Sequence, residues 1–319
     1  MVQRKKVLVC GASGFIGRNT VERLAQRDDM EVTAAYLTRP LPEIPGVRQI
    51  RIDLRDAAQA SEAVRGMDIL IQAAATTSGS KDIVSRPHLH VTDNAVLNSL
   101  LFRAAHDHGV GHVLFFSCTI MYPSSDSALR ETDFDANAAM NPRYFGGGWT
   151  KVYLEKMCEF YSGLGSTRFT AMRHSNIYGA HDKFDLERSH VFGATMTKVM
   201  QASDGRISVW GPGTERRDLL YVDDLMDFLE KAIDLQKSPY ELVNVGCGQA
   251  VSVKELVTEI VACSGKELVI EHDLTKPHIP SSLFLDISKA KELFGWSPKT
   301  TLRDGILKTM EWYRANVTS

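Results

Sequence analysis

The sequence has few cysteines and no long apolar run, and its charges almost balance. No apolar stretch approaches the roughly 18–20 residues needed to cross a bilayer. The net charge of −2 over 319 residues gives no overall attraction to nucleic acid or to an anionic membrane. The five cysteines form no metal-spaced pair and no disulfide framework: Cys10, Cys118, Cys158, Cys247 and Cys263. We therefore expect a reduced, cytoplasmic protein without a metal, which binds neither nucleic acid nor membrane.

A glycine-rich turn near the N-terminus is the most informative feature that is present. Gly11, Gly14 and Gly17 follow an apolar run over 7–10, in the pattern of a strand that turns sharply into a helix. The first glycine allows the turn, the second lets the backbone approach a pyrophosphate, and the third lets the helix pack against the strand. Free amides and the positive dipole end of the helix favour phosphate. The motif predicts a bound dinucleotide, held by Gly11, Ser13, Gly14, Phe15, Ile16 and Gly17.

Short apolar strands alternate with amphipathic helices in the first half of the chain, which is typical of a parallel sheet covered on both faces. The predicted strands are 6–10, 31–36, 49–52, 68–72, 112–116 and 168–172, and the predicted helices are 14–26, 57–64, 94–108, 150–161, 192–201, 222–235, 253–264 (capped by Ser252) and 302–313. The fold class is therefore α/β, a Rossmann-type doubly wound parallel sheet with a smaller, mostly C-terminal substrate-binding lobe. We assign 1–173 plus about 218–248 to the dinucleotide-binding domain, and about 174–217 plus 249–319 to the lobe.

The end of the second strand favours one dinucleotide over another. An NAD site usually has a carboxylate there to bind the ribose 2′-hydroxyl, but the segment 34–39 has none and ends in Arg39. An arginine suits the 2′-phosphate of NADP, although Arg39 as a solvated loop charge is an open alternative, and so is NAD. Asp53, after the third strand, is a candidate for the adenine amino group or a helix cap. Leu54, Ala73, Ala74 and Ala75 complete the predicted cofactor contacts.

Further motifs occur in order along nearly the whole chain. They are Asn94, the segments 117–123, 176–184, 189–191, 209–219, 221–224 and 244–248, and the glycine turn. Together they resemble the extended short-chain dehydrogenase/reductase family of nucleotide-sugar epimerases and dehydratases. Within that family the resemblance is greatest to the GDP-fucose synthases, which are 3,5-epimerases and 4-reductases. It implies a nucleotide-sugar substrate, hydride transfer at the sugar C4, and a homodimer built from the helices 94–108 and 150–161.

The same resemblance shows what the catalytic region lacks. The family uses a tyrosine four residues before a lysine; Lys151 matches the lysine, but Gly147 stands at the tyrosine position. Cys118 stands where the family has a serine or threonine, and Ile120 replaces the epimerising cysteine, while the partner histidine is kept as His190. A fixed proton-transfer group is typically worth 10²–10⁴-fold in rate.

Two interpretations of this loss stay open. In the first, another group carries the proton: Tyr144, brought in by a glycine-rich bend over 146–148, is the first candidate, followed by Thr119, Cys118 and His190. A packed loop aromatic and an unreactive buried thiol are the alternatives for Tyr144 and Cys118. In the second, the chain is a cofactor-bound homologue without turnover. An epimerase or dehydratase is the alternative among enzymes.

The resemblance also implies substrate contacts. Arg217 matches the residue that holds the substrate diphosphate, for which a bidentate guanidinium is suited; a surface ion pair with Asp218 is its alternative. Asn176 and His190 are expected near the diphosphate or sugar, and Trp210 is expected in the nucleotide pocket or else in the core. The stretch before the final strand lacks the family's basic residue and has Ser281 and Ser282 instead.

Overall fold

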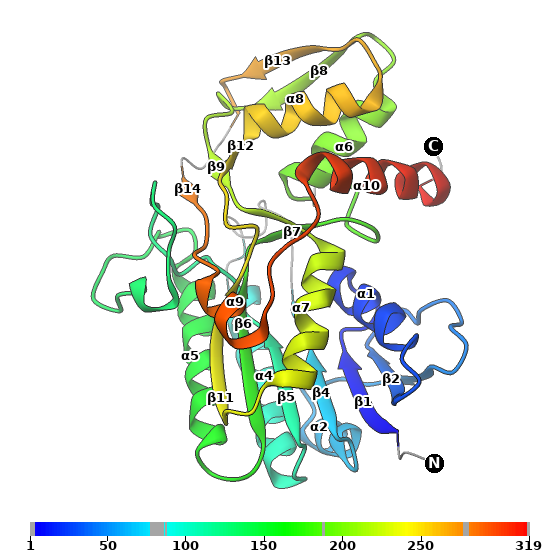
Figure 1. Ribbon diagram of the computed structural model, residues 1–319, viewed down its shortest axis with the longest axis vertical. Coiled ribbons are helices and arrows are strands. Elements are labelled where there is room, and N and C mark those ends of the chain that lie inside the picture. The colour runs from blue at the N-terminus through cyan, green and yellow to red at the C-terminus, as the bar shows by residue number, and fades with distance from the viewer. Residues whose placement is uncertain (1–3, 77–85, 87, 187–188, 277–280, 318–319) are drawn as a thin grey trace.

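A seven-stranded parallel sheet lies at the centre of the larger part of the computed structural model, which describes residues 4–76, 86, 88–186, 189–276 and 281–317 (Figure 1). Its first three strands in sequence are β1 (Lys5–Cys10), β2 (Met30–Tyr36) and β3 (Arg48–Arg51). The others are β4 (Ile69–Gln72), β5 (His112–Phe116), β6 (Arg168–His174) and β11 (Tyr240–Val245). The order β11-β6-β5-β4-β1-β2-β3 is the doubly wound one, and it confirms the predicted fold class.

Helices cover both faces of this sheet because its strands alternate side chains between two apolar clusters. Val7 and Val9 pack on one face with α1 (Phe15–Leu24), α7 (Val222–Leu235) and α9 (Ser288–Phe294). Leu8 and Cys10 pack on the other with α2 (Ala57–Val64), α4 (Leu89–Asp107) and α5 (Phe145–Ser162). A strand with apolar residues on both sides must be sandwiched in this way.

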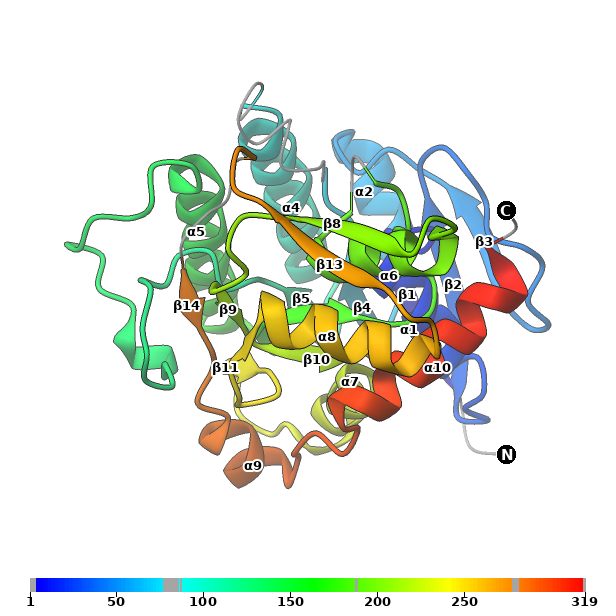
Figure 2. The ribbon, with the colours of Figure 1, turned by 90° about the horizontal axis from the view of Figure 1, so that it is seen from above.

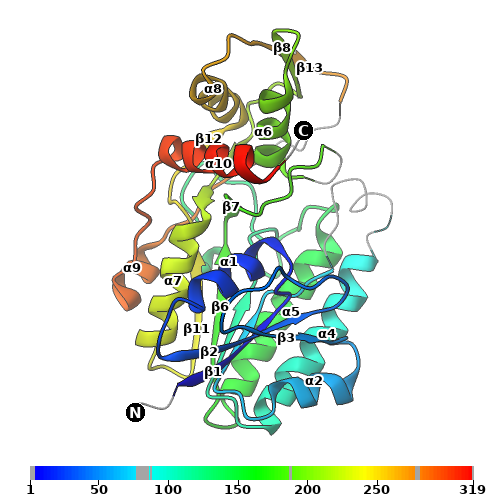
Figure 3. The ribbon, with the colours of Figure 1, turned by 90° about the vertical axis from the view of Figure 1, so that its right-hand side faces the viewer.

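A smaller lobe lies beyond the carboxyl ends of the strands (Figures 2 and 3). It contains α6 (Val191–Gln201), α8 (Val253–Ser264) and α10 (Leu302–Asn316), which share an apolar cluster. Short strands complete it: β7 (Asn176–Tyr178) with β10 (Leu219–Tyr221), β8 (Arg206–Trp210) with β13 (Val269–Asp273), and β12 (Val251–Ser252) with β9 (Arg216–Arg217) and β14 (Ser282–Leu283). The 3₁₀ turn Glu131–Asp133 lies in the long loop before α5.

The predicted elements match the structure with a few differences. All six predicted strands are present, Ser252 caps α8 by accepting a hydrogen bond from the amide of Glu255, and β11 is an additional strand. Helix α5 begins at Phe145, five residues before the predicted start, and α9 and the small strands of the lobe were not predicted. The division into two units stays a proposal; α9, placed in the lobe by that division, packs against the sheet. In the described part of the chain, no helix has the length and apolarity to span a membrane.

Candidate active site

The glycine turn is built so closely that side chains are excluded from it. Gly11 has φ +73°, and a Cβ placed on it would lie 2.6 Å from backbone atoms of Ala74. A Cβ on Gly17 would lie 2.1 Å from the carbonyl oxygen of Gly11, and Gly14 caps α1 without a side chain. This cradle, at the N-terminus of a helix and the carboxyl end of β1, fits the pyrophosphate of a dinucleotide.

The end of β4 lies against this turn, so two predicted parts of the cofactor site come together. The amide of Ala73 donates to the carbonyl of Cys10 at 3.2 Å. Asn94, on α4, accepts a hydrogen bond from the amide of Thr76 and donates one to its carbonyl. The segment that contains Ala73, Ala74 and Ala75 is thereby held beside the glycines. Its small side chains leave the backbone open to a ligand.

The predicted adenosine contacts lie one strand further along. Arg39 is exposed in the loop after β2, and Leu54 is buried after β3. Asp53 accepts hydrogen bonds from the amide and guanidinium of Arg55, which hold the pKa of its carboxyl at about 2. The expectation that Asp53 caps the next helix is wrong, because Asp56 is the residue that accepts from the amide of Gln59.

Lys151 projects from the second turn of α5 to the carboxyl end of β5. Its Nζ donates a 2.8 Å hydrogen bond to the carbonyl oxygen of Phe116 and lies 4.7 Å from the ring centre of Phe115. Burial lowers the pKa of this ammonium, and the nearby groups of Cys118 and Glu155 oppose that shift. The lysine is therefore fixed at the carboxyl edge of the sheet, where the glycine turn also lies.

Cys118 and Thr119 follow β5 directly. Burial raises the pKa of the Cys118 thiol, an effect that the charge of Lys151 opposes. A thiol in this state is a poor nucleophile and a weak proton donor at neutral pH. Thr119 is half-buried, and its carbonyl accepts the amide of Tyr122 in a tight turn.

The structure corrects the expected glycine bend. Gly146, Gly147 and Gly148 are not a bend but lie in the first turn of α5. The helix packs closely against other side chains there: a Cβ on Gly146 would lie 2.7 Å from Cγ2 of Val91, and one on Gly148 would lie 2.3 Å from the sulfur of Met140. Tyr144 is therefore not swung inward by a bend; it is the residue at the N-cap of α5, half-buried.

Two histidines lie close enough to affect each other, and one of them, His174, is also affected by the charge of Lys151. His190, at the N-cap of α6, is exposed, yet desolvation by the surrounding protein and the charge of Lys183 lower its pKa. His174, the last residue of β6, was missed by the sequence analysis. Its ring lies 6.0 Å from that of Phe116, its Nδ1 is 2.8 Å from the carbonyl of Ser175, and burial and the charges of Lys151 and His190 lower its pKa to about 4. The signal in the sequence is weak: His174 is the second polar residue, after Arg173, beyond the predicted strand 168–172.

Arg217 lies on β9, in the lobe beyond the carboxyl edge of the sheet. Its Nη1 donates to the carbonyl and hydroxyl oxygens of Ser281, and burial lowers the pKa of the guanidinium, while Tyr144 lies within electrostatic range of it. The alternative of a surface ion pair with Asp218 is wrong. Asp218 is fully buried and accepts hydrogen bonds from the amides of Cys247, Gly248 and Leu285.

The remaining predicted substrate residues lie on strands of the lobe. Asn176 begins β7, and its Nδ2 donates to the carbonyl of Asp218 at 3.2 Å. Trp210 ends β8, is 49% exposed, and has Lys198 and Lys276 within 6 Å of its ring. The alternative of a core tryptophan is therefore wrong, whereas a half-exposed aromatic ring near two cations is open to a ligand.

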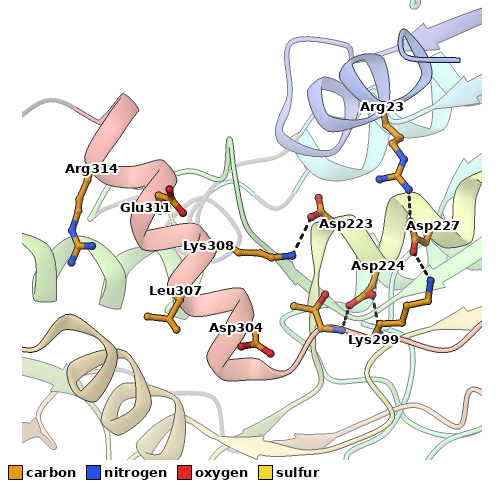
Figure 4. Close-up of a pocket in the computed structure, with 11 residues that line it drawn as sticks. Arg23, Asp223, Asp224, Asp227, Lys299, Asp304, Leu307, Lys308, Glu311 and Arg314 are labelled. Carbon is orange, nitrogen blue, oxygen red and sulfur yellow. Dashed lines mark hydrogen bonds and ion pairs between the residues drawn. The ribbon is translucent and has the colours of Figure 1, made fainter.

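A large charged groove of about 920 Å³ lies elsewhere, between α7, α10 and α1 (Figure 4). Its acidic and basic side chains pair with one another, as Arg23 and Lys299 do with Asp227, and Lys308 with Asp223. It contains none of the predicted site residues. Among the described residues, no group of three histidine, cysteine or acidic side chains is placed to hold a metal ion.

Comparison with known proteins agrees with this geometry. Residues 7–246 match the model of the NAD dependent epimerase/dehydratase family. A GDP-L-fucose synthase of Azorhizobium caulinodans is 28% identical, over 98% of this chain and 97% of that protein. A dTDP-4-dehydro-6-deoxy-D-allose reductase of a Streptomyces species is 30% identical, over 97% of this chain and 96% of that protein. The fold is similar to that of UDP-glucose 4-epimerase from Thermotoga maritima, with a TM-score of 0.86 and 22% identity over 98% of this chain and all of that one.

The chain thus belongs to the NAD dependent epimerase/dehydratase family. This confirms the predicted family and the predicted class of protein, an NAD(P)-dependent enzyme that modifies nucleotide sugars. The roles of the individual residues stay predictions.

Proposed function

We propose that this chain transfers hydride between a nicotinamide dinucleotide and C4 of a sugar linked to a nucleoside diphosphate. GDP is the nucleoside diphosphate that we propose first. The observation that carries the proposal is the fixed Lys151 ammonium, which lies at the same carboxyl edge of the sheet as the glycine cradle. The GDP-L-fucose synthase and the deoxyallose reductase that resemble this chain support the substrate class.

NADP is the proposed dinucleotide. The cradle of Gly11 and Gly17 would hold its pyrophosphate, and Arg39 would meet the 2′-phosphate, because no carboxylate ends β2. Lys151 would bind the nicotinamide ribose. When bound, the reduced nicotinamide supplies a hydride; the chain's own residues orient the sugar and supply the proton.

Tyr144 is the proposed proton carrier. Reduction of a C4 ketone adds a hydride to carbon and a proton to oxygen, so one acid must stand at that oxygen. Tyr144 is half-buried, caps the helix that carries Lys151, and lies within electrostatic range of Arg217, the proposed diphosphate ligand.

Epimerisation at C3 and C5 is not part of the proposal. Ile120 has no exchangeable proton where the resemblance expects a cysteine, and His190 alone serves at most one carbon. A single-site epimerase is therefore the alternative enzyme.

One observation favours a second function, a cofactor-bound protein without turnover. A Cβ at Gly147 would lie 3.3 Å from Cδ1 of Ile120, so Ile120 already occupies the space beside the missing tyrosine.

Absorbance of the reduced nicotinamide tests both functions. Purified protein is mixed with NADPH, and then with GDP-linked 4-keto-6-deoxy sugars and their UDP and dTDP counterparts. A sugar-dependent loss of absorbance is the expected result. Binding of NADPH without any change on adding sugars would replace the proposal with the non-catalytic function.

A homodimer through α4 and α5 and a cytoplasmic location are further proposals. Phe145, Tyr153 and Phe160 on α5 are 58%, 50% and 60% exposed, which suits a contact with a second copy. Sedimentation velocity of the wild type and of F160E checks the dimer.

A further inference from the structure

Glu215 is a buried carboxylate that no hydrogen-bond donor of the described residues reaches. It is 6% exposed, and neither Oε1 nor Oε2 has a partner among the described residues. It lies just before β9, in the lobe. A buried charge normally pairs or accepts several hydrogen bonds, because its loss of hydration costs several kcal/mol. Glu215 is thus an acceptor site that the protein itself leaves incomplete.

The backbone geometry around β9 places the side chains of Glu215 and Arg217 on the same face of the strand. Residue pairs Val251 with Arg217 and Ser252 with Arg216 define the antiparallel ladder. The amide of Val253 donates to the carbonyl of Glu215 at 2.9 Å, so the ladder continues through Glu215. Side chains two residues apart on a strand point to the same face. The charge of Glu215 also acts on the Arg217 guanidinium, which agrees with this placement.

We propose that Glu215 binds the ribose of the nucleoside diphosphate, by accepting hydrogen bonds from its 2′- and 3′-hydroxyls. This inference rests on the proposed function, in which Arg217 holds the diphosphate. Two residues along a strand span about 6.6 Å. In a nucleoside diphosphate the ribose is the group next to the diphosphate, and its vicinal diol presents two neighbouring donors to the two oxygens of a carboxylate.

The nucleobase is the other group of the ligand that could donate two hydrogen bonds to the Glu215 carboxylate. Guanine also presents two adjacent N–H groups, at N1 and N2, but its edge lies further from the diphosphate than the ribose hydroxyls do. Since both carboxylate oxygens are enclosed, entry of the nucleoside requires the neighbouring side chains to shift. Glu215 would then select ribonucleotides over 2′-deoxyribonucleotides, and so GDP and UDP over dTDP.

Calorimetric titration of the full chain with GDP, 2′-deoxy-GDP and inosine diphosphate tests the inference. Hydrogen bonds to a charged group are worth about 10- to 100-fold in affinity. We expect the wild type to bind GDP more tightly than 2′-deoxy-GDP by about that factor, and inosine diphosphate as tightly as GDP. E215Q and E215L should lose the preference and bind GDP less tightly. E271Q, which removes an exposed carboxylate of β13 in the same lobe, should behave as the wild type.

Thermal unfolding separates a binding role from a structural one. E215L removes an unpartnered charge, so its melting temperature should equal or exceed that of the wild type while its GDP affinity falls. Unchanged GDP affinity in both Glu215 variants would overturn the inference. So would a Glu215-dependent preference for GDP over inosine diphosphate, which assigns the carboxylate to the base. If the wild type bound no nucleoside diphosphate, including UDP and dTDP, the proposed function itself would fail.

Discussion

The ammonium nitrogen of Lys151 lies 2.8 Å from the carbonyl oxygen of Phe116, the last residue of β5. This hydrogen bond joins α5 to the edge of the sheet at which the glycine turn also ends. The same nitrogen lies 4.7 Å from the ring centre of Phe115, so a backbone oxygen and an aromatic ring together hold the lysine in place. The chemistry proposed above therefore depends first on Lys151.

Replacing Lys151 with alanine should lower kcat/KM at least about 100-fold, because a positioned, half-buried cation is lost from the place where we propose that the nicotinamide ribose binds. The affinity for NADPH should fall as well. Lys156→Ala is the matched control, since Lys156 is an exposed residue of the same helix that pairs with Glu159. Steady-state kinetics and NADPH fluorescence titration measure both effects. Equal activity of K151A and the wild type would refute the assigned role.

Replacing Tyr144 with phenylalanine removes only the phenolic oxygen. If Tyr144 carries the proton, turnover should fall about 10²–10⁴-fold, with NADPH binding unchanged. Tyr153→Phe, on the exposed face of the same helix, should keep full activity. A Y144F enzyme with wild-type turnover would exclude Tyr144, and His174 would then be the next side chain to test, since it lies beside Lys151 and His190.

Gly11→Ala tests the cofactor cradle. The added Cβ would meet the backbone of Ala74 at 2.6 Å, in a left-handed conformation that already disfavours alanine. We expect loss of NADPH binding. Gly46→Ala is the control because Gly46 has a similar φ of +77° but no atom within 4 Å of an added Cβ. G46A should be slightly destabilised, by about 1 kcal/mol, and should bind NADPH normally. Fluorescence titration compares the two.

The part of the molecule built on the seven-stranded sheet was predictable from the sequence, because the sequence patterns that define it are local. A glycine at a positive φ, an apolar run and a helix cap each depend on neighbouring residues, as Gly11 and Ser252 illustrate. The strands of the lobe were not predictable in this way, since β9 pairs with segments more than 30 residues away. The three glycines over 146–148 also misled the prediction. Glycine indicates either a bend or close packing, and only the tertiary contacts of Val91 and Met140 distinguish the two.

A buried ion pair beneath the site should dominate the response to mutation of α5. Glu155 and Arg173 are both 3% or less exposed in their side chains and 2.7 Å apart, and Ser117 donates a further hydrogen bond to Glu155. Glu155→Gln leaves the Arg173 charge buried without its partner, which typically costs 3–5 kcal/mol. Glu159→Gln breaks only the exposed pair with Lys156 and should cost less than about 1 kcal/mol. Urea unfolding measures both; equal costs would contradict the prediction.

His112 should make the fold sensitive to mild acid. It is 1% exposed in β5, its Nε2 lies 2.8 Å from the Thr170 hydroxyl, and burial, with the charges of Arg168 and Lys5, lowers its pKa to about 3. Below the ordinary pKa of 6.5 the unfolded chain takes up a proton that the folded chain does not. The contribution of His112 to the free energy of unfolding is therefore complete above pH 6.5, and it falls as the pH falls toward 3.

At pH 5 the loss from His112 amounts to about 2 kcal/mol, from 1.36 kcal/mol per unit of pH below 6.5. His112→Gln keeps a polar side chain of similar length but does not titrate, so its free energy of unfolding should decline less between pH 7 and pH 5, by about this amount. The carboxylates and His174 contribute equally to both proteins and cancel in the comparison. Urea unfolding at the two pH values measures the difference. Parallel declines in the wild type and H112Q would show that the folded protein accommodates a protonated His112.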